Sequence, residues 1–212
     1  MDLEWNRGYD RKRVSEILQI GAVKVDTLGH KVVDTFNVFI KPALHKKFDH
    51  GAKFLPDLQC SLDSNVSFVS AWASFERWCA GDTVFAFWGD GDFDTVRENC
   101  RYWGLPHTEP TKVYDFQAAF SQVLGGEGQQ IALSRAVEYC GFPELFEYHN
   151  ALYDAIYTTL VGMLLGAEAT RETTAEAARR KLRIRARIRS RWEDQMATPS
   201  FVNSSLIMIY PL

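Results

Sequence analysis

Two acidic residues at the start of the chain, and a histidine and an aspartate near its C-terminal third, have a spacing that suits metal chemistry. Asp2 and Glu4 are two residues apart, so on an extended strand both carboxylates point to the same face. His149 and Asp154 are five residues apart, at the start of an expected helix over 150–165. A histidine on the loop before this helix can fold back toward an aspartate in its first turns.

A third acidic position lies in the middle of the chain. Asp92 follows the continuously apolar segment 83–88, which is typical of a central strand of a sheet. Because sites in α/β proteins are assembled at the ends of strands, we expect Asp92 to meet the other acidic residues. Four converging carboxylates are stable only beside a cation, and hard oxygen ligands favour Mg²⁺ or Mn²⁺.

These residue types together indicate phosphodiester hydrolysis. Two divalent ions about 4 Å apart activate the attacking water and stabilise the leaving oxygen. A neutral imidazole, here that of His149, takes the proton of the water because its pKa lies near the working pH. The other histidines show no ligand spacing and are interpreted as loop or surface residues: His30, His45, His50 and His107.

The elements that position these groups are strands and helices in mixed order. Strands are expected at 16–25, 31–41, 83–88 and, as a strand or a helix start, 112–116. Helices are expected at 64–79, 92–103, 115–124, 130–141 and 150–165. The first two strands form an antiparallel hairpin and the helical crossovers favour parallel pairing, so the fold class is α/β with a mixed sheet.

The sequence makes specific predictions for two of the helices. Ser64 or Asn65 is expected to cap the helix that ends at Cys79. Its buried face is expected to contain Phe68, Trp72 and Phe75. The helix over 92–103 is expected to place Val96, Cys100 and Trp103 on one side.

The composition suits a globular protein. A chain of 212 residues with 46% apolar residues can bury the core of one domain with an appendage. No apolar run is long enough to span a membrane, and the charged N-terminus is unlike a signal peptide. The four cysteines are scattered, which favours reduced thiols in a cytoplasmic protein.

The composition changes after Gly166, and this predicts a C-terminal extension over 167–212. Segment 179–191 holds eight cations and no acid, which leaves the rest of the chain at about −11. It is interpreted either as a phosphate-binding element or as a solvated basic face. Apolar and cationic residues alternate over 181–189, as in a strand. The apolar end, 201–212, is expected to pack on the body or on a second copy in a homodimer.

The motifs resemble the DEDDh branch of the DnaQ-like 3′-to-5′ exonucleases, and the match spans about residues 1–165. The three motifs are matched by Asp2-Leu3-Glu4-Trp5 with 16–23, by 87–92 (FWGDGD), and by 149–155 (HNALYDA). The group of the histone-mRNA exonuclease and the bacterial KapD-like proteins is the most similar, because a Trp-Gly pair also precedes its second-motif aspartate. The spacing from Trp88 to Asp92 selects this aspartate over Asp90 and Asp94.

The resemblance implies a role for each residue. The fold would be RNase H-like, with a five-stranded mixed sheet over 1–166. Asp2 would bridge two Mg²⁺ or Mn²⁺ ions, Glu4 and Asp154 would complete the shell of the first, and Asp92 would hold the second through water. His149 would be the general base. Trp5 is either a platform for the terminal base or a buried strand residue.

The resemblance also implies a substrate, and it leaves alternatives open. The expected activity is 3′-to-5′ hydrolysis of single-stranded RNA, in preference to DNA, to nucleoside monophosphates. Along the basic segment, the phosphate backbone would be guided by Arg183, Arg185 and Arg187. Only Met1 precedes Asp2, where this family usually has several apolar residues, so Asp2 is expected to be held less firmly. The alternatives are a proofreading DNA exonuclease and a binding or regulatory protein with weakened catalysis.

Overall fold

The computed structural model describes residues 1–8, 14–26, 31–80, 84–89, 91–106, 110, 112–123 and 130–165. The expected turn at 27–30, Asp90 and the whole segment from 166 onward lie outside the described residues. The expectations for the basic segment 179–191, for Arg183, Arg185 and Arg187, and for the apolar end 201–212 therefore lie outside them too.

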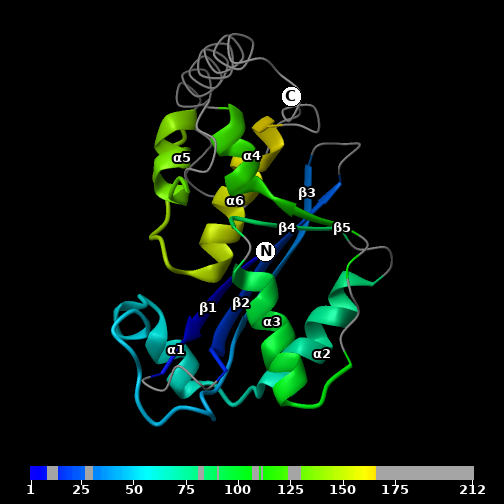
Figure 1. The fold of residues 1–212 in the computed structure, drawn as a ribbon, viewed down its shortest axis with the longest axis vertical. Coiled ribbons are helices and arrows are strands. Elements are labelled where there is room, and N and C mark those ends of the chain that lie inside the picture. The colour runs from blue at the N-terminus through cyan, green and yellow to red at the C-terminus, as the bar shows by residue number, and fades with distance from the viewer. Residues whose placement is uncertain are drawn as a thin grey trace, which may run out of the picture.

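Three antiparallel strands form the larger sheet, in the order β1-β2-β3 (Figure 1). They are β1 (Asp2–Asn6), β2 (Glu16–Asp26) and β3 (Lys31–Phe39). Asp2 pairs with Gly21 and Glu4 pairs with Gln19, and the register shifts between Glu4 and Trp5. Such an irregularity redirects the side chains that follow it, so it separates the two acidic residues from the rest of the strand.

A parallel pair completes the set of five expected strands. The pair comprises β4 (Val84–Phe87) and β5 (Lys112–Asp115). The Met1 amino group donates to the Ala86 carbonyl at 2.7 Å and so joins the two sheets. The expected order of antiparallel strands first and parallel strands afterwards is confirmed. The strands pair as a group of three and a group of two.

Helices cover both faces of the larger sheet. Helices α2 (Phe68–Cys79) and α3 (Gly91–Tyr102) share one apolar cluster with Leu3, Ile20 and Ala22 of the strands. On the other side, α6 (Ala151–Leu165) packs against β2 at Gly21, where an added Cβ would lie 2.1 Å from the Ala151 carbonyl carbon. The short elements η1 (Ala52–Phe54) and α1 (Leu58–Asp63) follow β3.

A second apolar cluster lies between α6 and two shorter helices. These are α4 (Phe116–Val123) and α5 (Leu133–Cys140), which stand beside α6 in Figure 1. The ring of Phe116 lies where a Cβ on Gly162 would stand, so α6 needs a glycine at this crossing. The second cluster packs α6 against α4 and α5, while Gly21 of β2 contacts the start of α6, where the third motif lies.

Two expectations for the helices were wrong in detail. The cap of α2 is Ser67, whose hydroxyl accepts from Ser70 N at 3.2 Å, whereas the Ser64 hydroxyl donates to the Phe39 carbonyl. Helix α3 ends at Tyr102, so Trp103 falls beyond it and is 37% exposed. Local propensity did not show which serine caps α2, because the bond from Ser64 to the β3 carbonyl forms only in the folded protein.

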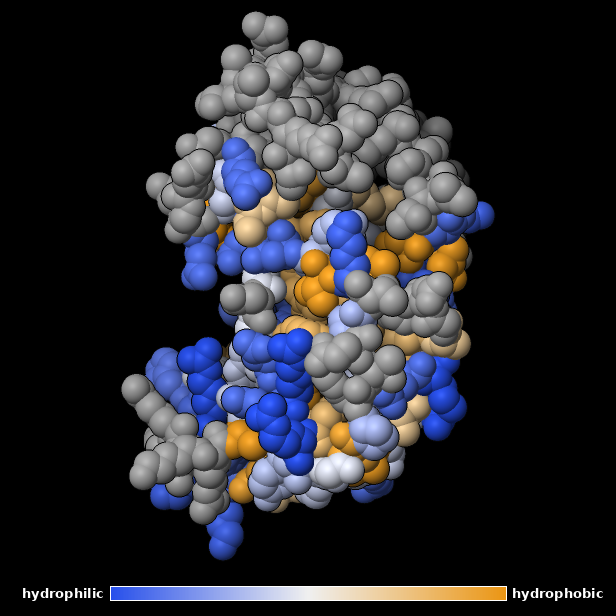
Figure 2. Space-filling view, turned by 45° about the vertical axis from the view of Figure 1, so that its right-hand side comes forward, coloured by the Kyte–Doolittle hydropathy of each residue, from blue (hydrophilic) through white to orange (hydrophobic). Residues whose placement is uncertain are grey.

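The surface mixes hydrophilic and apolar areas (Figure 2). The edge formed by β4 and β5 exposes Val84 and Val113. All four cysteines are free thiols. Within the part of the chain that the structure describes, no helix has the length and apolar character needed to cross a membrane.

Candidate active site

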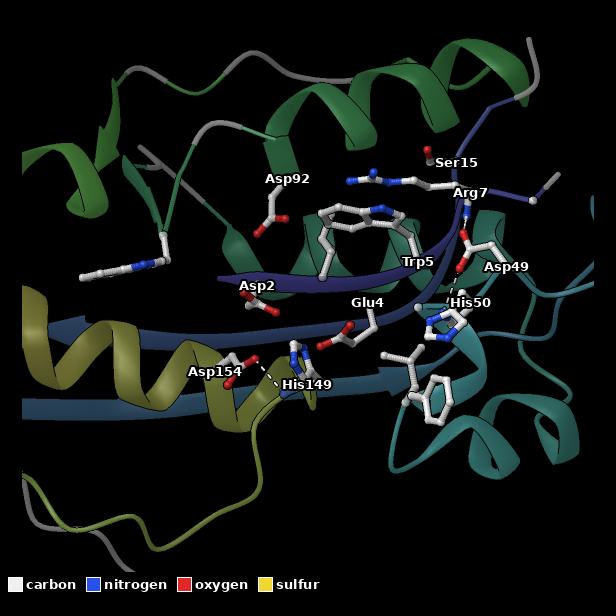
Figure 3. A pocket seen from close by; sticks show the side chains of 17 residues that line it. Asp2, Glu4, Trp5, Arg7, Ser15, Asp49, His50, Asp92, His149 and Asp154 are labelled. Atoms are coloured by element: carbon white, nitrogen blue, oxygen red, sulfur yellow. Dashed lines mark hydrogen bonds between the residues drawn. The ribbon is translucent and has the colours of Figure 1, made fainter. Parts of the chain in front are cut away.

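All five residues of the expected site line one pocket of about 1090 Å³ (Figure 3). They come from three elements that are far apart in the sequence. Strand β1 supplies Asp2 and Glu4, the first turn of α3 supplies Asp92, and the start of α6 supplies Asp154 with His149 just before it. The roles of these residues are not decided by their placement, which shows only that one site can use them together.

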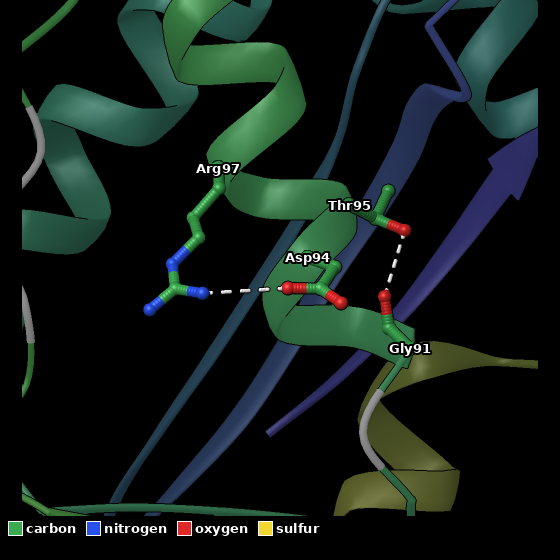
Figure 4. Close-up of polar contacts among 4 residues, drawn as sticks. All are labelled: Gly91, Asp94, Thr95 and Arg97. Atoms are coloured by element: carbon green, nitrogen blue, oxygen red, sulfur yellow. Dashed lines mark hydrogen bonds and ion pairs between the residues drawn. The ribbon is translucent and has the colours of Figure 1, made fainter.

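The first turn of α3 separates its two aspartates. Asp92 is 7% exposed and faces the pocket, where it accepts a hydrogen bond from the Leu3 backbone. Asp94 instead pairs with Arg97 at 3.4 Å on the exposed side of the helix (Figure 4). The Thr95 hydroxyl donates to the Gly91 carbonyl, so this bond lies within α3 itself. The structure therefore places Asp92, and not Asp94, beside the other acids.

His149 and Asp154 are held together through the backbone. The His149 N–H donates to Asp154 Oδ2 at 3.0 Å, while Asp154 Oδ1 is buried and has no partner. His149 has φ of 66°, in the left-handed region that costs energy for a residue with a side chain. Its side chain is exposed toward the pocket. Strain of this kind persists where the surroundings fix it, and here Asp154 does so.

A polar network anchors the start of α6 to the sheet. Asn150 caps the helix, because its Oδ1 accepts from the backbone N–H of Leu152 and Tyr153. Gln19 of β2 accepts from Ala151 N at 3.1 Å and donates to Asn150 Oδ1 at 3.3 Å. The Asn150 amide also donates to Asp57 Oδ2. These bonds tie the residues that flank His149 to β2 and to the segment before α1.

Burial raises the pKa of all four carboxyl groups, and repulsion by neighbouring acids adds to the rise for Asp2, Glu4 and Asp92. Burial is the largest cause in each case, and it raises the pKa of Glu4 to about 8 and that of Asp92 to about 7. The pKa of Asp154 rises to about 6, and that of Asp2 rises well above its ordinary value because the group is buried and because Asp92, Asp154 and Glu4 lie nearby. The site therefore disfavours four negative charges unless a cation joins them.

The donor atoms fit a divalent metal ion. Ligand atoms of Glu4, His149 and Asp154 all lie within 4.8 Å of one another. The unpartnered Asp154 oxygen is a buried acceptor without a donor, which a cation would satisfy. Asp2 and Asp92 lie outside this group of three but line the same pocket. The carboxylate oxygens of this set are hard ligands, which suit Mg²⁺ or Mn²⁺.

A model of the RNase T exonuclease family matches residues 1–161 of the chain. The chain belongs to this exonuclease family. Members of the family typically use divalent metal ions, in agreement with the donor set described above. No curated protein matches the sequence.

Three solved nucleases share the fold of this exonuclease. The nuclease domain of 3′hExo, a DEDDh family member bound to rAMP, has a TM-score of 0.66 at 18% identity, over 78% of this chain and 90% of that one. The cell-death related nuclease CRN-4 has a TM-score of 0.63 at 19% identity, over 78% and 63%. A full-length 3′-exonuclease has 0.65 at 15% identity, over 77% and 57%. The expected DEDDh relationship and RNase H-like fold are confirmed.

The remaining residues singled out from the sequence have mixed outcomes. Trp5 lines the pocket and is also half-buried against the core, so both interpretations describe part of its environment. His45 is a structural residue whose Nε2 lies 2.8 Å from the Val14 carbonyl. Asp115, to which the sequence assigned no role, accepts from Gly89 N and Ala118 N and so supports the turn before α3 and the start of α4.

Sequence reasoning missed the far half of the pocket. His50, expected to be an ordinary loop residue, lines it, and so do Arg7, Asp49 and Phe54. Segment 43–63 has no clear period, so nothing in its pattern indicated a wall of the exonuclease site. The Gln19–Asn150 bond was missed as well, because the two residues are 131 positions apart.

Proposed function

We propose that this protein is a 3′-to-5′ exonuclease that releases nucleoside monophosphates from single-stranded nucleic acid. The observation that carries the proposal is the meeting of Asp2, Glu4, Asp92, His149 and Asp154 in one pocket of a chain that belongs to an exonuclease family. A preference for RNA over DNA is supported by 3′hExo, which has the same fold and was solved with rAMP bound.

The four carboxylates are proposed to hold two Mg²⁺ or Mn²⁺ ions. Such ions supply a water nucleophile at neutral pH and charge stabilisation for the leaving oxygen. Asp2 is proposed to serve both positions, Glu4 and Asp154 the first, and Asp92 the second. The raised pKa values support this, because they show that the cluster favours neutralisation of its charge. A bound cation neutralises the carboxylates and displaces their protons.

His149 is proposed to be the general base. Its ring is exposed to the pocket and therefore reaches water, and it is more exposed than any of the four carboxylates. Its backbone is held in a single conformation by Asp154, so the ring starts from a fixed point beside Glu4. Trp5 is proposed as the surface on which the terminal base stacks.

Stepwise cleavage of labelled oligonucleotides tests the activity. A 5′-labelled single-stranded RNA and the matching DNA are incubated with Mg²⁺ or Mn²⁺, and we expect a ladder that shortens from the 3′ end, faster with RNA. Asp92→Asn and Asp154→Asn should abolish the ladder, whereas Asp94→Asn should preserve it. A folded wild-type protein that produces no ladder would reject the proposal.

Other outcomes would identify the alternatives. Metal binding measured by calorimetry without hydrolysis would point to a binding or regulatory protein. A preference for mispaired DNA ends, together with co-purification of a polymerase, would point to proofreading.

We also propose the division into an exonuclease domain, 1–166, and an extension, 167–212. The alternating basic pattern supports contact between the phosphate backbone and Arg183, Arg185 and Arg187. The apolar end of the extension, 201–212, supports a homodimer. The free cysteines support a cytoplasmic location. Light scattering and oligonucleotide binding, each compared between the full chain and a chain ending at 166, test the first two points.

A further inference from the structure

The pocket has a second half that the proposed metal chemistry does not use. Beyond Glu4 and Trp5 it is lined by Arg7, Ser15, Asp49, His50 and Phe54. Its total volume of about 1090 Å³ exceeds the range of about 300–1,000 Å³ that is usual for small-ligand pockets. A mononucleotide at the acidic half therefore leaves space that is lined by different chemistry.

Arg7 projects into this half from a firmly held backbone. Its N–H donates to Asp49 Oδ2 at 2.7 Å, and Asn6 Oδ1 accepts from both Gly8 N and Asp49 N at 3.0 Å. Asn6 is fully buried and donates to the Lys47 carbonyl at 3.1 Å. The end of β1 is thus joined to the opposite pocket wall, and the Arg7 side chain starts from a defined position.

Two further contacts fix the conformation of the backbone around Gly8 and Asp49. Gly8 has φ of 65°, and an added Cβ would lie 2.5 Å from the His45 ring. The second oxygen of Asp49 accepts from Ala52 N at 2.9 Å at the start of η1. Both Asp49 oxygens are therefore engaged by backbone N–H groups and hold the wall in place.

The Arg7 guanidinium is directed at the ligand space. Figure 3 shows its side chain running beside the Trp5 ring toward the acidic half. Among the described residues that line the pocket, Arg7 is the only arginine or lysine. Within the described part of the chain no carboxylate forms an ion pair with it, and the pKa values of the four site acids are set by other groups. Its charge is available for an anion from the substrate.

We propose that Arg7 binds a second phosphate of the substrate, one nucleoside away from the phosphate that is cleaved. A guanidinium offers a planar fork of donors that matches phosphate oxygens. Two sources have this chemistry, the next phosphodiester along the strand and a phosphate on the terminal 3′ oxygen. The inference rests on the proposed exonuclease function. It adds a substrate class to that function, namely strand ends that carry two phosphates within reach of the pocket.

Three short ligands separate these cases. The dinucleotide ApA has one phosphate, the trinucleotide ApApA adds the next phosphodiester, and ApAp adds a 3′-terminal phosphate. We measure kcat/KM of the full chain on each with Mn²⁺, for wild type, Arg7→Gln, Arg7→Lys and the control Arg101→Gln. Arg101 lies in the last turn of α3 and does not line the pocket, so its substitution removes the same charge elsewhere.

Arg7→Gln should lower kcat/KM on a two-phosphate ligand roughly 10- to 100-fold more than on ApA. A selective loss on ApApA assigns the subsite to the strand, and a selective loss on ApAp assigns it to a terminal phosphate. Arg7→Lys should fall between Arg7→Gln and wild type, because it keeps the charge without the fork. Arg101→Gln should match wild type.

An equal loss on all three ligands, or no loss on any, would overturn the Arg7 inference. If wild type hydrolyses none of the ligands, the proposed function fails, and calorimetric affinity for the same ligands then tests Arg7 separately. In that case ApApA or ApAp should bind wild type more tightly than ApA, and Arg7→Gln should remove the difference. Thermal unfolding of each variant verifies that it is folded.

Discussion

Asp154 is a buried carboxylate with one satisfied and one unsatisfied oxygen. Oδ2 accepts from His149 N, while Oδ1 has no partner. One of the two oxygens lies within 4.8 Å of ligand atoms of Glu4 and His149. A buried acceptor without a donor is costly in a metal-free protein. Asp154 therefore has both a structural task, through the His149 backbone, and a proposed task as a metal ligand.

Substitution of the two residues should separate these tasks. His149→Ala should lower kcat roughly 10²- to 10⁴-fold while metal affinity changes little, because a general base acts on water and not on the ion. Asp154→Asn should lower both kcat and metal affinity, the latter by at least roughly 10-fold. Single-turnover cleavage and calorimetry with Mn²⁺ measure the two effects, with Asp94→Asn as the control. An equal loss of metal affinity in both variants would make His149 a ligand.

The raised pKa values predict how stability depends on pH. A carboxyl group whose folded pKa lies above its unfolded pKa stabilises the protein fully below the unfolded value, and this contribution is lost as the pH rises through the folded value. Metal-free protein should therefore lose stability between about pH 4 and 8, through the pKa values of about 6, 7 and 8 of Asp154, Asp92 and Glu4.

Thermal unfolding in chelator measures this slope. A loss of roughly 1 kcal/mol lowers Tm by about 2–4 °C in a protein of this size, and at least this much is expected from pH 5 to 8. Asp92→Asn, which cannot ionise, should reduce the slope between pH 4 and 7. A wild-type Tm that rises over the same range would show that the carboxylates are not held as the structure has them.

At the scale of elements, the start of α6 is fixed from two directions. Its cap, Asn150, is bonded to Gln19 and Asp57, and its backbone rests on Gly21 of β2. The approach is so close that no side chain fits at Gly21. The position of the third motif relative to the first is thus set by a backbone contact between one helix and one strand.

Gly21→Ala should destabilise the protein, because its Cβ would lie 2.1 Å from backbone atoms that cannot rotate away. We expect a loss of about 1–3 kcal/mol or more in the free energy of unfolding, measured by chemical denaturation, with a fall in kcat as α6 shifts. Gly91→Ala is the matched control for stability, since nothing lies within 4 Å of its added Cβ. Equal stability of the two variants would mean that α6 adapts to a side chain at Gly21.

At the scale of the whole molecule, the acidic site lies where the two sheets and α6 meet. Asp2 and Glu4 come from the three-stranded sheet, Asp92 follows β4 of the two-stranded sheet, and Asp154 belongs to α6. In a metal-free protein, repulsion within the site acts between these parts. A bound cation is expected to join them and to stabilise the whole fold.

Metal should therefore raise the unfolding temperature. At a concentration 100 times the dissociation constant, a ligand that binds only the folded state adds about 2.7 kcal/mol. Mn²⁺ or Mg²⁺ should raise Tm at pH 7.5, and chelator should reverse the rise. Asp94→Asn should respond like wild type, whereas Asp92→Asn and Asp154→Asn should respond less. An identical rise in all four proteins would place the bound metal elsewhere.

The sequence by itself determined the residue types of the site and most of the elements that hold them. Motifs such as 149–155 and segments such as 16–25 are local patterns, and local patterns can be recognised in the sequence alone. The spacing from Trp88 had already selected Asp92 over Asp94. Only the tertiary structure decided that His149 has a left-handed backbone, and that Arg7 enters the same pocket. These features depend on bonds between distant residues, such as Asn6 with Asp49 and Gln19 with Asn150, and no local spacing encodes them.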